Sequence, residues 1–375
     1  MAVIKYLGSK RTLVPVLGEI AAAVGARTAL DLFTGTTRVA QEFKRRGVEV
    51  TANDRAAYSA VLSDCFVATD AATVDLDALD EALAHLDALP GRPGYVTETF
   101  CHASRYFQPH NGARIDAVRH ALETDFADHP LRAVLMTSLL VAADRVDSTT
   151  GVQMAYLKSW SPRSYRDLRL VRPDLLPGPG TTLRGEAADA VDLVGPVDLA
   201  YLDPPYNQHR YETNYHVWET LVRGDEPDHY GVACKRVDSR DLERKSVFNI
   251  KRAMPAALAD LVARVRAEVV VVSCNDESWV SPHDLQGWLQ DAGHERVALL
   301  GFDARRYVGA QIGVFNAAGE RVGQARRLRN VEHLLVAGPS ARVEAAVAAV
   351  EGGVFPAHVP ALTGEPACRD QVPAT

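Results

Sequence analysis

The sequence has few cysteines, and they are scattered along the chain. Its 375 residues include five, with no CxxC pair and no Cys/His cluster. A structural zinc site or a disulfide framework needs such clustering, so the spacing disfavours both. Dispersed free thiols are typical of a protein in a reducing compartment. We therefore expect no metal site and a cytoplasmic location.

Long apolar runs and an excess of positive charge are also lacking. The most apolar stretch, around residues 133–143, is too short to span a bilayer, and the chain starts at MAVIKYLGSK without the zones of a signal peptide. We therefore expect no membrane partner. The formal net charge of −7 by itself disfavours a nucleic-acid partner. Residues 158–172 nevertheless carry five basic side chains and one acid, and residues 305–329 carry six arginines and one acid. Such runs are either solvated surface or a phosphate-binding face, and charge alone does not decide between them.

Strand and helix patterns alternate in two parts of the chain that a different pattern separates. A short apolar run at residues 29–33 leads into the turn TGTT, a helical stretch RVAQEFKRRG and a second strand VEVTAND, which is typical of a βαβ unit. From about residue 63 to 176 the pattern is mostly helical. Alternation then resumes with the apolar runs 197–202 and 267–275, and a hairpin is expected over residues 306–338. The sequence predicts an α/β fold with a mostly parallel sheet, a helical insertion and a terminal antiparallel hairpin.

Two features that follow the first strands could bind a ligand. Gly35 in DLFTGTT would let backbone amides approach a ligand at a helix amino terminus, but it could equally serve a plain tight turn. The dinucleotide fingerprint GxGxxG is absent because Thr37 stands where a second glycine would be, which disfavours a nicotinamide oxidoreductase. Asp54, after the second strand, could accept hydrogen bonds from ribose hydroxyls or cap the next helix. Each feature alone leaves both interpretations open.

The strongest signal is the segment VDLAYLDPPYN. Its apolar strand ends at Asp203, Pro204, Pro205 and Tyr206, and the prolines place Asp203 at the carboxyl end of the strand, where ligands bind in open α/β sheets. Transfer of a group to an exocyclic amine needs acceptors aimed at the amine hydrogens. The Asp203 carboxylate and the Pro204 carbonyl supply them, and Tyr206 offers a face on which an extruded base can stack. Such a site needs neither a metal nor a nucleophilic side chain.

Together these segments resemble the DNA adenine-N6 methyltransferases that use S-adenosylmethionine, and more closely their Dam-like group of the restriction-modification type. KYLGSK resembles the first box of that group, DLFTGTTRVA its glycine box, and GEAAD followed by DLAYLDPPYN the region that holds the cofactor adenine and the target base. In that group the glycine box comes first, a target-recognition insertion follows, and the DPPY box comes last. The similarity extends over roughly residues 3–338.

The resemblance implies roles for individual residues. Lys10 would lie near the cofactor carboxylate, Asp54 at the ribose and Glu186 near the cofactor adenine. All the implied cofactor contacts are Tyr6, Lys10, Asp31, Phe33, Gly35, Asp54 and Glu186. The target adenine would be held by Asp203, Pro204, Pro205 and Tyr206. The implied phosphate contacts are Lys158, Arg163, Arg166, Arg169, Arg305 and Arg306. Thr37 departs from the glycine box, and Thr36 or Thr37 could cap the helix instead.

The same resemblance implies a Rossmann-like class I methyltransferase sheet. Residues 1–62 and 177–340 would form the S-adenosylmethionine-binding catalytic domain, residues 63–176 a helical target-recognition insertion, and residues 341–375 a helix and a flexible tail. We expect site-specific methylation of adenine N6 in double-stranded DNA by base flipping, with a restriction endonuclease for the same site as a candidate partner. The alternatives are an RNA adenine or protein amide methyltransferase, or a catalytically silent DNA-binding regulator. The segment NYHVWETL is expected to be a core helix, and ordering over the flipped base is the alternative.

Overall fold

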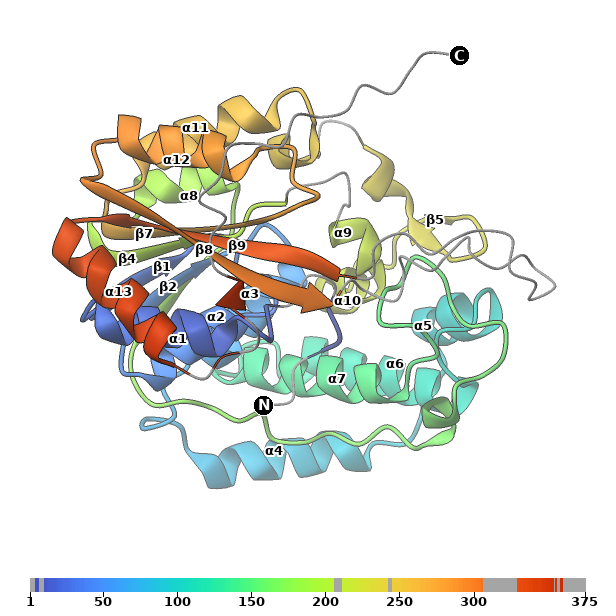
Figure 1. Cartoon of the computed structure of the whole chain (residues 1–375). Coiled ribbons are helices and arrows are strands. Elements are labelled where there is room, and N and C mark those ends of the chain that lie inside the picture. The colour runs from blue at the N-terminus through green and yellow to red at the C-terminus, as the bar shows by residue number, and fades with distance from the viewer. Residues whose placement is uncertain are drawn as a thin grey trace, which may run out of the picture.

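An eight-stranded sheet organises the fold in the computed structural model, which describes residues 4–6, 10–205, 211–241, 245–305, 329–353, 355 and 358–359. The strands lie in the order β10–β8–β9–β7–β4–β1–β2–β3 (Figure 1). Parallel ladders join β3, β2, β1, β4 and β7, and antiparallel ladders continue the sheet through β9, β8 and β10. Their bounds are β1 Thr28–Asp31, β2 Glu49–Asn53, β3 Gly180–Leu183, β4 Val197–Leu202, β7 Ala267–Asn275, β8 Arg296–Arg305, β9 Arg329–Gly338 and β10 His358–Val359. The mostly parallel α/β sheet that the sequence predicts is confirmed.

Helices cover both faces of this sheet, which is why its central strands are apolar throughout. One face packs against α1, α2 and α13, and the other against α8, α11 and α12 (Figure 1). In β7, for example, Val269 and Val271 face one helical layer while Val270 and Val272 face the other. The bounds of the helices are α1 Val14–Ala23, α2 Arg38–Arg45, α8 Ala187–Leu193, α11 Met254–Arg264, α12 Pro282–Asp291 and α13 Ser340–Gly352.

A third hydrophobic cluster lies in a helical part of the molecule that extends beyond the sheet (Figure 1). It is built from residues that precede β3 and from residues that follow β4. Its helices are α3 Ala57–Ser63, α4 Leu76–Ala88, α5 Tyr95–Thr97, α6 Pro109–Thr124, α7 Arg132–Val146, α9 Tyr211–Asn214 and α10 His216–Arg223. In α10, Val217, Trp218 and Leu221 are 0–1% exposed. The prediction that NYHVWETL contributes a core helix is therefore confirmed.

The antiparallel pair begins earlier than the sequence predicts. Its second strand, β9, falls within the expected hairpin segment 306–338, but its first strand is β8, which ends at Arg305. Alternate β8 side chains pack on opposite faces of the sheet: Leu300 and Phe302 on one face, Val297 and Leu299 on the other. Burial on both faces gives a continuous apolar run instead of an alternating one, which hides the strand from a period-2 search. Residues 306–328 lie outside the described residues.

A short hairpin of β5 (His229–Tyr230) and β6 (Lys235–Arg236) follows α10. In the part of the chain that the structure describes, no helix is long and apolar enough to cross a membrane.

Candidate active site

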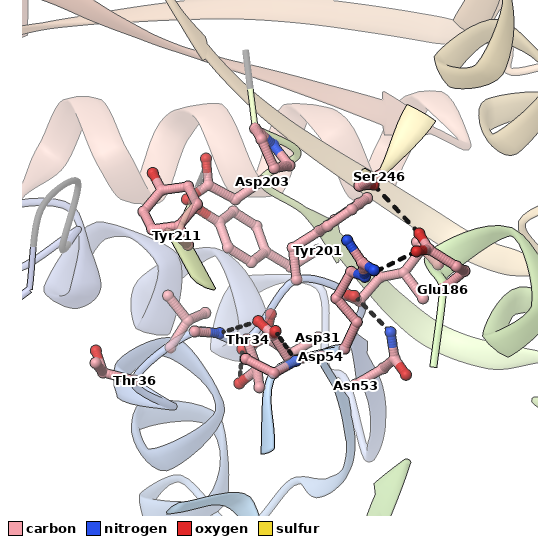
Figure 2. A pocket seen from close by; sticks show the side chains of 18 of the residues that line it. Asp31, Thr34, Thr36, Asn53, Asp54, Glu186, Tyr201, Asp203, Tyr211 and Ser246 are labelled. Carbon is pink, nitrogen blue, oxygen red and sulfur yellow. Dashed lines mark hydrogen bonds and ion pairs between the residues drawn. The ribbon is translucent and has the colours of Figure 1, made fainter. Parts of the chain in front are cut away.

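One cavity opens at the carboxyl ends of β1, β2 and β4, and its walls come from segments far apart in the sequence. It encloses about 1030 Å³ of space, part of it open to solvent. Carboxyl ends of neighbouring parallel strands meet at one sheet edge, so the topology itself brings these residues together. Figure 2 shows Asp203 and Tyr211 on one side of the cavity, Asp31 and Asp54 on another, and Glu186 beside Ser246.

Most of the residues singled out in the sequence line this cavity. They are Tyr6, Lys10, Asp31, Phe33, Gly35, Asp54, Glu186, Asp203 and Pro205. Pro204 is buried, and Tyr206 lies outside the described residues. The cavity also has lining residues that sequence reasoning missed, among them Arg38, Asn53, Arg55, Tyr211, Lys245, Ser246 and Asn249.

The turn after β1 keeps its shape without a second glycine. Gly35 has φ +53°, and a Cβ atom there would lie 3.2 Å from the Tyr6 ring, so the close approach needs glycine. Thr37 also adopts the left-handed conformation, with φ +62°, which is uncommon for a β-branched residue. It occupies the N-cap position of α2, but its hydroxyl does not cap the helix: it donates to the Thr36 carbonyl and accepts from Gln41 Nε2. Thr37 therefore takes the backbone conformation that a glycine would supply.

Asp54 connects this turn to the end of β2. Its carboxylate accepts hydrogen bonds from the Gly35 and Ala56 amides, both at 3.0 Å. Burial raises its pKa, and those two amides act in the opposite direction. Asp54 does not cap α3, so that interpretation is wrong. Instead, the buried Glu219 of α10 accepts from the first α3 amides, those of Ala57 (2.9 Å) and Tyr58 (3.3 Å). The Asp54 side chain is thus turned toward the cavity and the glycine turn.

Two further carboxylates lie on the cavity wall: Asp31 is buried and Asp203 is partly buried. Burial raises the pKa of Asp31 to about 7, although the Thr34 hydroxyl donates to it at 2.9 Å. Burial also raises the pKa of Asp203 to about 6, and Lys10 opposes this rise. The Lys10 ammonium lies 3.1 Å from Asp203 Oδ1 and 2.9 Å from Glu332 Oε2. Lys10 thus joins the DPPY segment to β9, a contact that sequence reasoning missed.

Aromatic rings form another wall. Tyr6 stacks between Tyr211, with ring centroids 5.2 Å apart, and Tyr215, at 4.6 Å. Phe33 meets Phe248 edge to face at 5.1 Å. The signal for Tyr211 was present in the sequence, because it follows Tyr206 by only five residues.

The predicted adenine end of the cavity is polar. Glu186 pairs with Arg55 at 2.8 Å and accepts a hydrogen bond from the Ser246 hydroxyl at 3.2 Å. Asn53 is 1% exposed, and its amide nitrogen donates to the Leu32 and Gly185 carbonyls. Its Oδ1 is buried without a hydrogen-bond partner among the described residues. The wall therefore keeps an acceptor that a ligand could use.

Four of the predicted phosphate contacts, those between residues 158 and 169, are not part of this cavity wall and differ in their surroundings. Lys158, Arg166 and Arg169 are exposed, and Arg169 pairs with Asp87 at 3.3 Å. Arg163 instead donates from Nε to the nearly buried Asp147 carboxylate at 2.9 Å and from Nη2 to the Thr149 carbonyl. The Arg305 side chain and all of Arg306 lie outside what the structure describes.

The site has the parts of a group-transfer centre. Among the described residues, no three or more His, Cys, Asp or Glu side chains are grouped so that they could hold a metal. The cavity instead combines buried carboxylates, an aromatic stack and a glycine turn, which suit a cationic nucleoside-like ligand next to a base.

Comparison with known proteins gives the family. Residues 6–264 match the D12 class N6 adenine-specific DNA methyltransferases. Type II methyltransferase M.NlaIII of Neisseria lactamica is 31% identical over 291 residues, which cover 74% of this chain and 84% of that protein. Type II methyltransferase M.CviAII of Paramecium bursaria Chlorella virus 1 is 28% identical, with 81% of this chain and 97% of that protein covered. Modification methylase StsI of Streptococcus sanguinis is also 28% identical over 76% of this chain, which spans only 46% of StsI. The chain belongs to the D12 class N6 adenine-specific DNA methyltransferases.

Proposed function

We propose that S-adenosylmethionine is the methyl donor and that this cavity holds both the donor and the adenine to be methylated, taken out of double-stranded DNA. The observation that carries the proposal is the convergence of Asp31, Asp54 and Asp203 on one cavity, each at the carboxyl end of a different parallel strand. The family fixes the reaction as N6 methylation of adenine in DNA. The donor, the residue roles and the duplex substrate are our proposals.

The cavity residues fit this donor. S-adenosylmethionine supplies an electrophilic methyl group on a sulfonium, and it also carries an ammonium group, two ribose hydroxyls and an adenine. A buried carboxylate whose pKa is raised to about 7 is stabilised by a nearby cation, so we place Asp31 with Phe33 and Gly35 at the methionine end. Asp54 accepts from the ribose hydroxyls. Glu186 and the Asn53 Oδ1 acceptor face the adenine, and Tyr6 closes the cavity over the donor.

Asp203 and Pro204 hold the target amine. The Asp203 carboxylate and the Pro204 carbonyl accept the two amine hydrogens, which turns the nitrogen lone pair toward the methyl group. Pro205 restricts the backbone that carries this carbonyl, and Tyr206 provides the stacking face for the extruded base. Because the pKa of Asp203 is about 6, the carboxylate is ionised at neutral pH and can take up the proton that the amine releases. Lys10 keeps it ionised by its charge.

We propose that residues 63–176 form the insertion that reads DNA, that residues 1–62 and 177–340 form the catalytic domain, and that residues 341–375 add a helix and a tail. Lys158, Arg166 and Arg169, together with Arg305 and Arg306, would contact phosphates. Arg163 would act indirectly: its bond to Asp147 fixes the segment that carries Lys158, Arg166 and Arg169. The names of the Type II relatives support a restriction endonuclease for the same site as partner.

The test is a methylation map. The chain is expressed in a host that lacks adenine methylation, and the host DNA is sequenced by a method that reports N6-methyladenine at single-base resolution. One DNA motif modified throughout the genome is expected. Asp203→Ala should abolish the modification while donor affinity and the circular dichroism spectrum stay at wild-type values.

Asp189→Ala, at an exposed carboxylate on α8, is the matched control and should methylate normally. If the purified chain binds S-adenosylmethionine but leaves every adenine in DNA unmodified, the proposed substrate is wrong. RNA adenines and protein amides would then be tested with the same protein, and a chain that modifies neither would be a silent DNA-binding regulator.

A further inference from the structure

Glu332 contacts Lys10, a residue of the cavity wall, from a strand that runs antiparallel to β7. The parallel strands β1, β2 and β4 each bring a residue to this sheet edge at their carboxyl ends. Because β9 is antiparallel to β7, it presents its amino-terminal part at the same edge, where Glu332 lies opposite Asn275 in the ladder. Glu332 also pairs in register with Phe302 of β8, so ladders on both sides fix its backbone. It lies beyond residues 6–264, the segment that matches the family.

The side chain of Glu332 takes part in a chain of contacts that ends at Asp203. One carboxylate oxygen accepts from Asn275 Nδ2 at 3.3 Å, and the other lies 2.9 Å from the Lys10 ammonium. That ammonium lies 3.1 Å from Asp203 Oδ1. The Lys10 side chain is 6% exposed, and those of Glu332 and Asp203 are each 17% exposed. One buried ammonium is therefore shared by two carboxylates, and only one of them belongs to the DPPY segment.

Sharing the ammonium has two consequences for Asp203. First, the flexible Lys10 side chain adopts fewer conformations when Glu332 also holds its ammonium group. Lys10 then fixes the position of the Asp203 oxygen that it contacts. The other oxygen can then be aimed at the target amine. Second, the negative charge of Glu332 offsets part of the positive charge of Lys10, so Asp203 is less acidic than Lys10 alone would make it. Glu332 does not need to touch the substrate for either effect.

We propose that Glu332 is a positioning residue for methyl transfer, which orients Lys10 against Asp203. The inference rests on the role proposed above for Asp203. Within the described residues, the other charged or titratable groups that face Asp203 are Asp31 on β1, Tyr201 on β4, Tyr211 on α9 and Cys274 on β7, with the Ser273 hydroxyl of β7 beside it. None of them changes in the variants below.

The test compares Glu332→Ala and Glu332→Gln in the full-length chain, on genomic DNA from a host without adenine methylation. Glu332→Ala frees Lys10, and kcat should fall about tenfold to a hundredfold while KM for S-adenosylmethionine changes little. Glu332→Gln keeps an oxygen for the ammonium but removes the charge, so kcat should be largely rescued. Since that lost charge had raised the pKa of Asp203, the acid limb of its kcat–pH profile should move to lower pH.

Glu268→Ala is the matched control, because Glu268 is also a sheet carboxylate in an ion pair, with Arg342 at 3.2 Å, but on the amino-terminal half of β7. It should leave kcat and the pH profile unchanged. Wild-type kcat in Glu332→Ala, or a Glu332→Gln profile that coincides with the wild-type profile, would overturn the inference and leave the proposed function standing. A wild-type chain that methylates no adenine would instead overturn the proposed function and this inference with it.

Discussion

The carboxylate of Asp31 should cost the folded protein stability whenever it is ionised without a cation. Its side chain is 1% exposed, and burial raises its pKa from 3.8 to about 7. The unfolded chain ionises this group near pH 4, so between pH 4 and 7 the folded state binds the extra proton. The contribution of protonated Asp31 to the free energy of unfolding is fully present below about pH 4. It falls progressively as the pH rises from 4 and is lost once the pH has passed 7. At pH 8 the loss corresponds to about 4 kcal/mol.

Asp31→Asn should therefore stabilise the donor-free protein at alkaline pH. The amide has nearly the same shape and keeps an oxygen that can accept from the Thr34 hydroxyl, but it carries no charge. In urea unfolding at pH 8, we expect the free energy of unfolding to rise by up to about 4 kcal/mol, with the two proteins converging near pH 4. The same variant should bind S-adenosylmethionine more weakly in calorimetry, because the ionised partner of its positive groups is gone.

Asp198→Asn, on β4, is a control for which we expect the opposite effect on stability. The Asp198 carboxylate accepts from the Arg27 and Thr28 amides at 2.8 and 2.9 Å, and these bonds lower its pKa. A carboxylate with a lowered pKa stabilises the fold at neutral pH, so this variant should be less stable than wild type at pH 8. An Asp31→Asn protein that is no more stable than wild type at pH 8, or whose difference does not depend on pH, would refute the account of Asp31.

Three further predictions concern activity, packing and DNA binding. The wild-type kcat should fall about tenfold per pH unit below pH 6 as Asp203 becomes protonated, measured with saturating donor and DNA; a flat profile down to pH 5 would contradict its role. Glu219→Ala should lower the free energy of unfolding by about 2–4 kcal/mol, because two buried α3 amides lose a charged acceptor; a loss under about 0.5 kcal/mol in denaturant would exclude that capping role. Arg163→Ala should destabilise the fold by about 3 kcal/mol through the loss of its bond to Asp147. Arg166→Ala should leave stability unchanged and reduce the salt dependence of DNA binding by about one phosphate contact. Equal effects of the two arginine variants on stability and on DNA binding would contradict the division of roles between Arg163 and Arg166.

The sequence predicts the carboxylates of the site better than the groups that tune them. Asp54 follows VEVTAN and Asp203 follows VDLAYL, and the pattern predicts both segments as strands. The carboxyl ends of parallel strands share one edge, so the convergence of the two carboxylates follows from pattern and topology. Glu332 could not be found in this way. The hairpin prediction makes NVEHLLVAG one strand of an antiparallel pair but does not say how that strand runs relative to β7. Only its antiparallel direction relative to β7 brings Glu332 to Lys10.

Charged residues show a second limit of the sequence. The basic run at residues 158–172 shows where positive charge is concentrated, yet the partner of Arg163 is Asp147, sixteen residues earlier. The pattern cannot separate that buried pairing from an exposed side chain such as Arg166, since both are arginines on a polar stretch. Which arginines hold the fold and which are left exposed on the proposed DNA-binding surface depends on tertiary contacts, which neither composition nor spacing encodes.

Gln153 links the helical part of the molecule to the segment that follows the DPPY motif. Gln153 is 2% exposed. Its backbone amide donates to the Asn214 carbonyl at 2.8 Å, and its side-chain oxygen accepts from the Val217 backbone amide at 2.9 Å. Its carbonyl lies 3.0 Å from His216 Nε2 and 2.6 Å from the Tyr106 hydroxyl.

Burial lowers the pKa of His216 to about 3, so this contact carries no charge at neutral pH and salt does not screen it. The same helix, α10, caps α3 through Glu219, and α3 begins three residues after Asp54. Buried contacts therefore join the proposed DNA-reading insertion to α10 through Gln153, and α10 through Glu219 to the helix that follows Asp54.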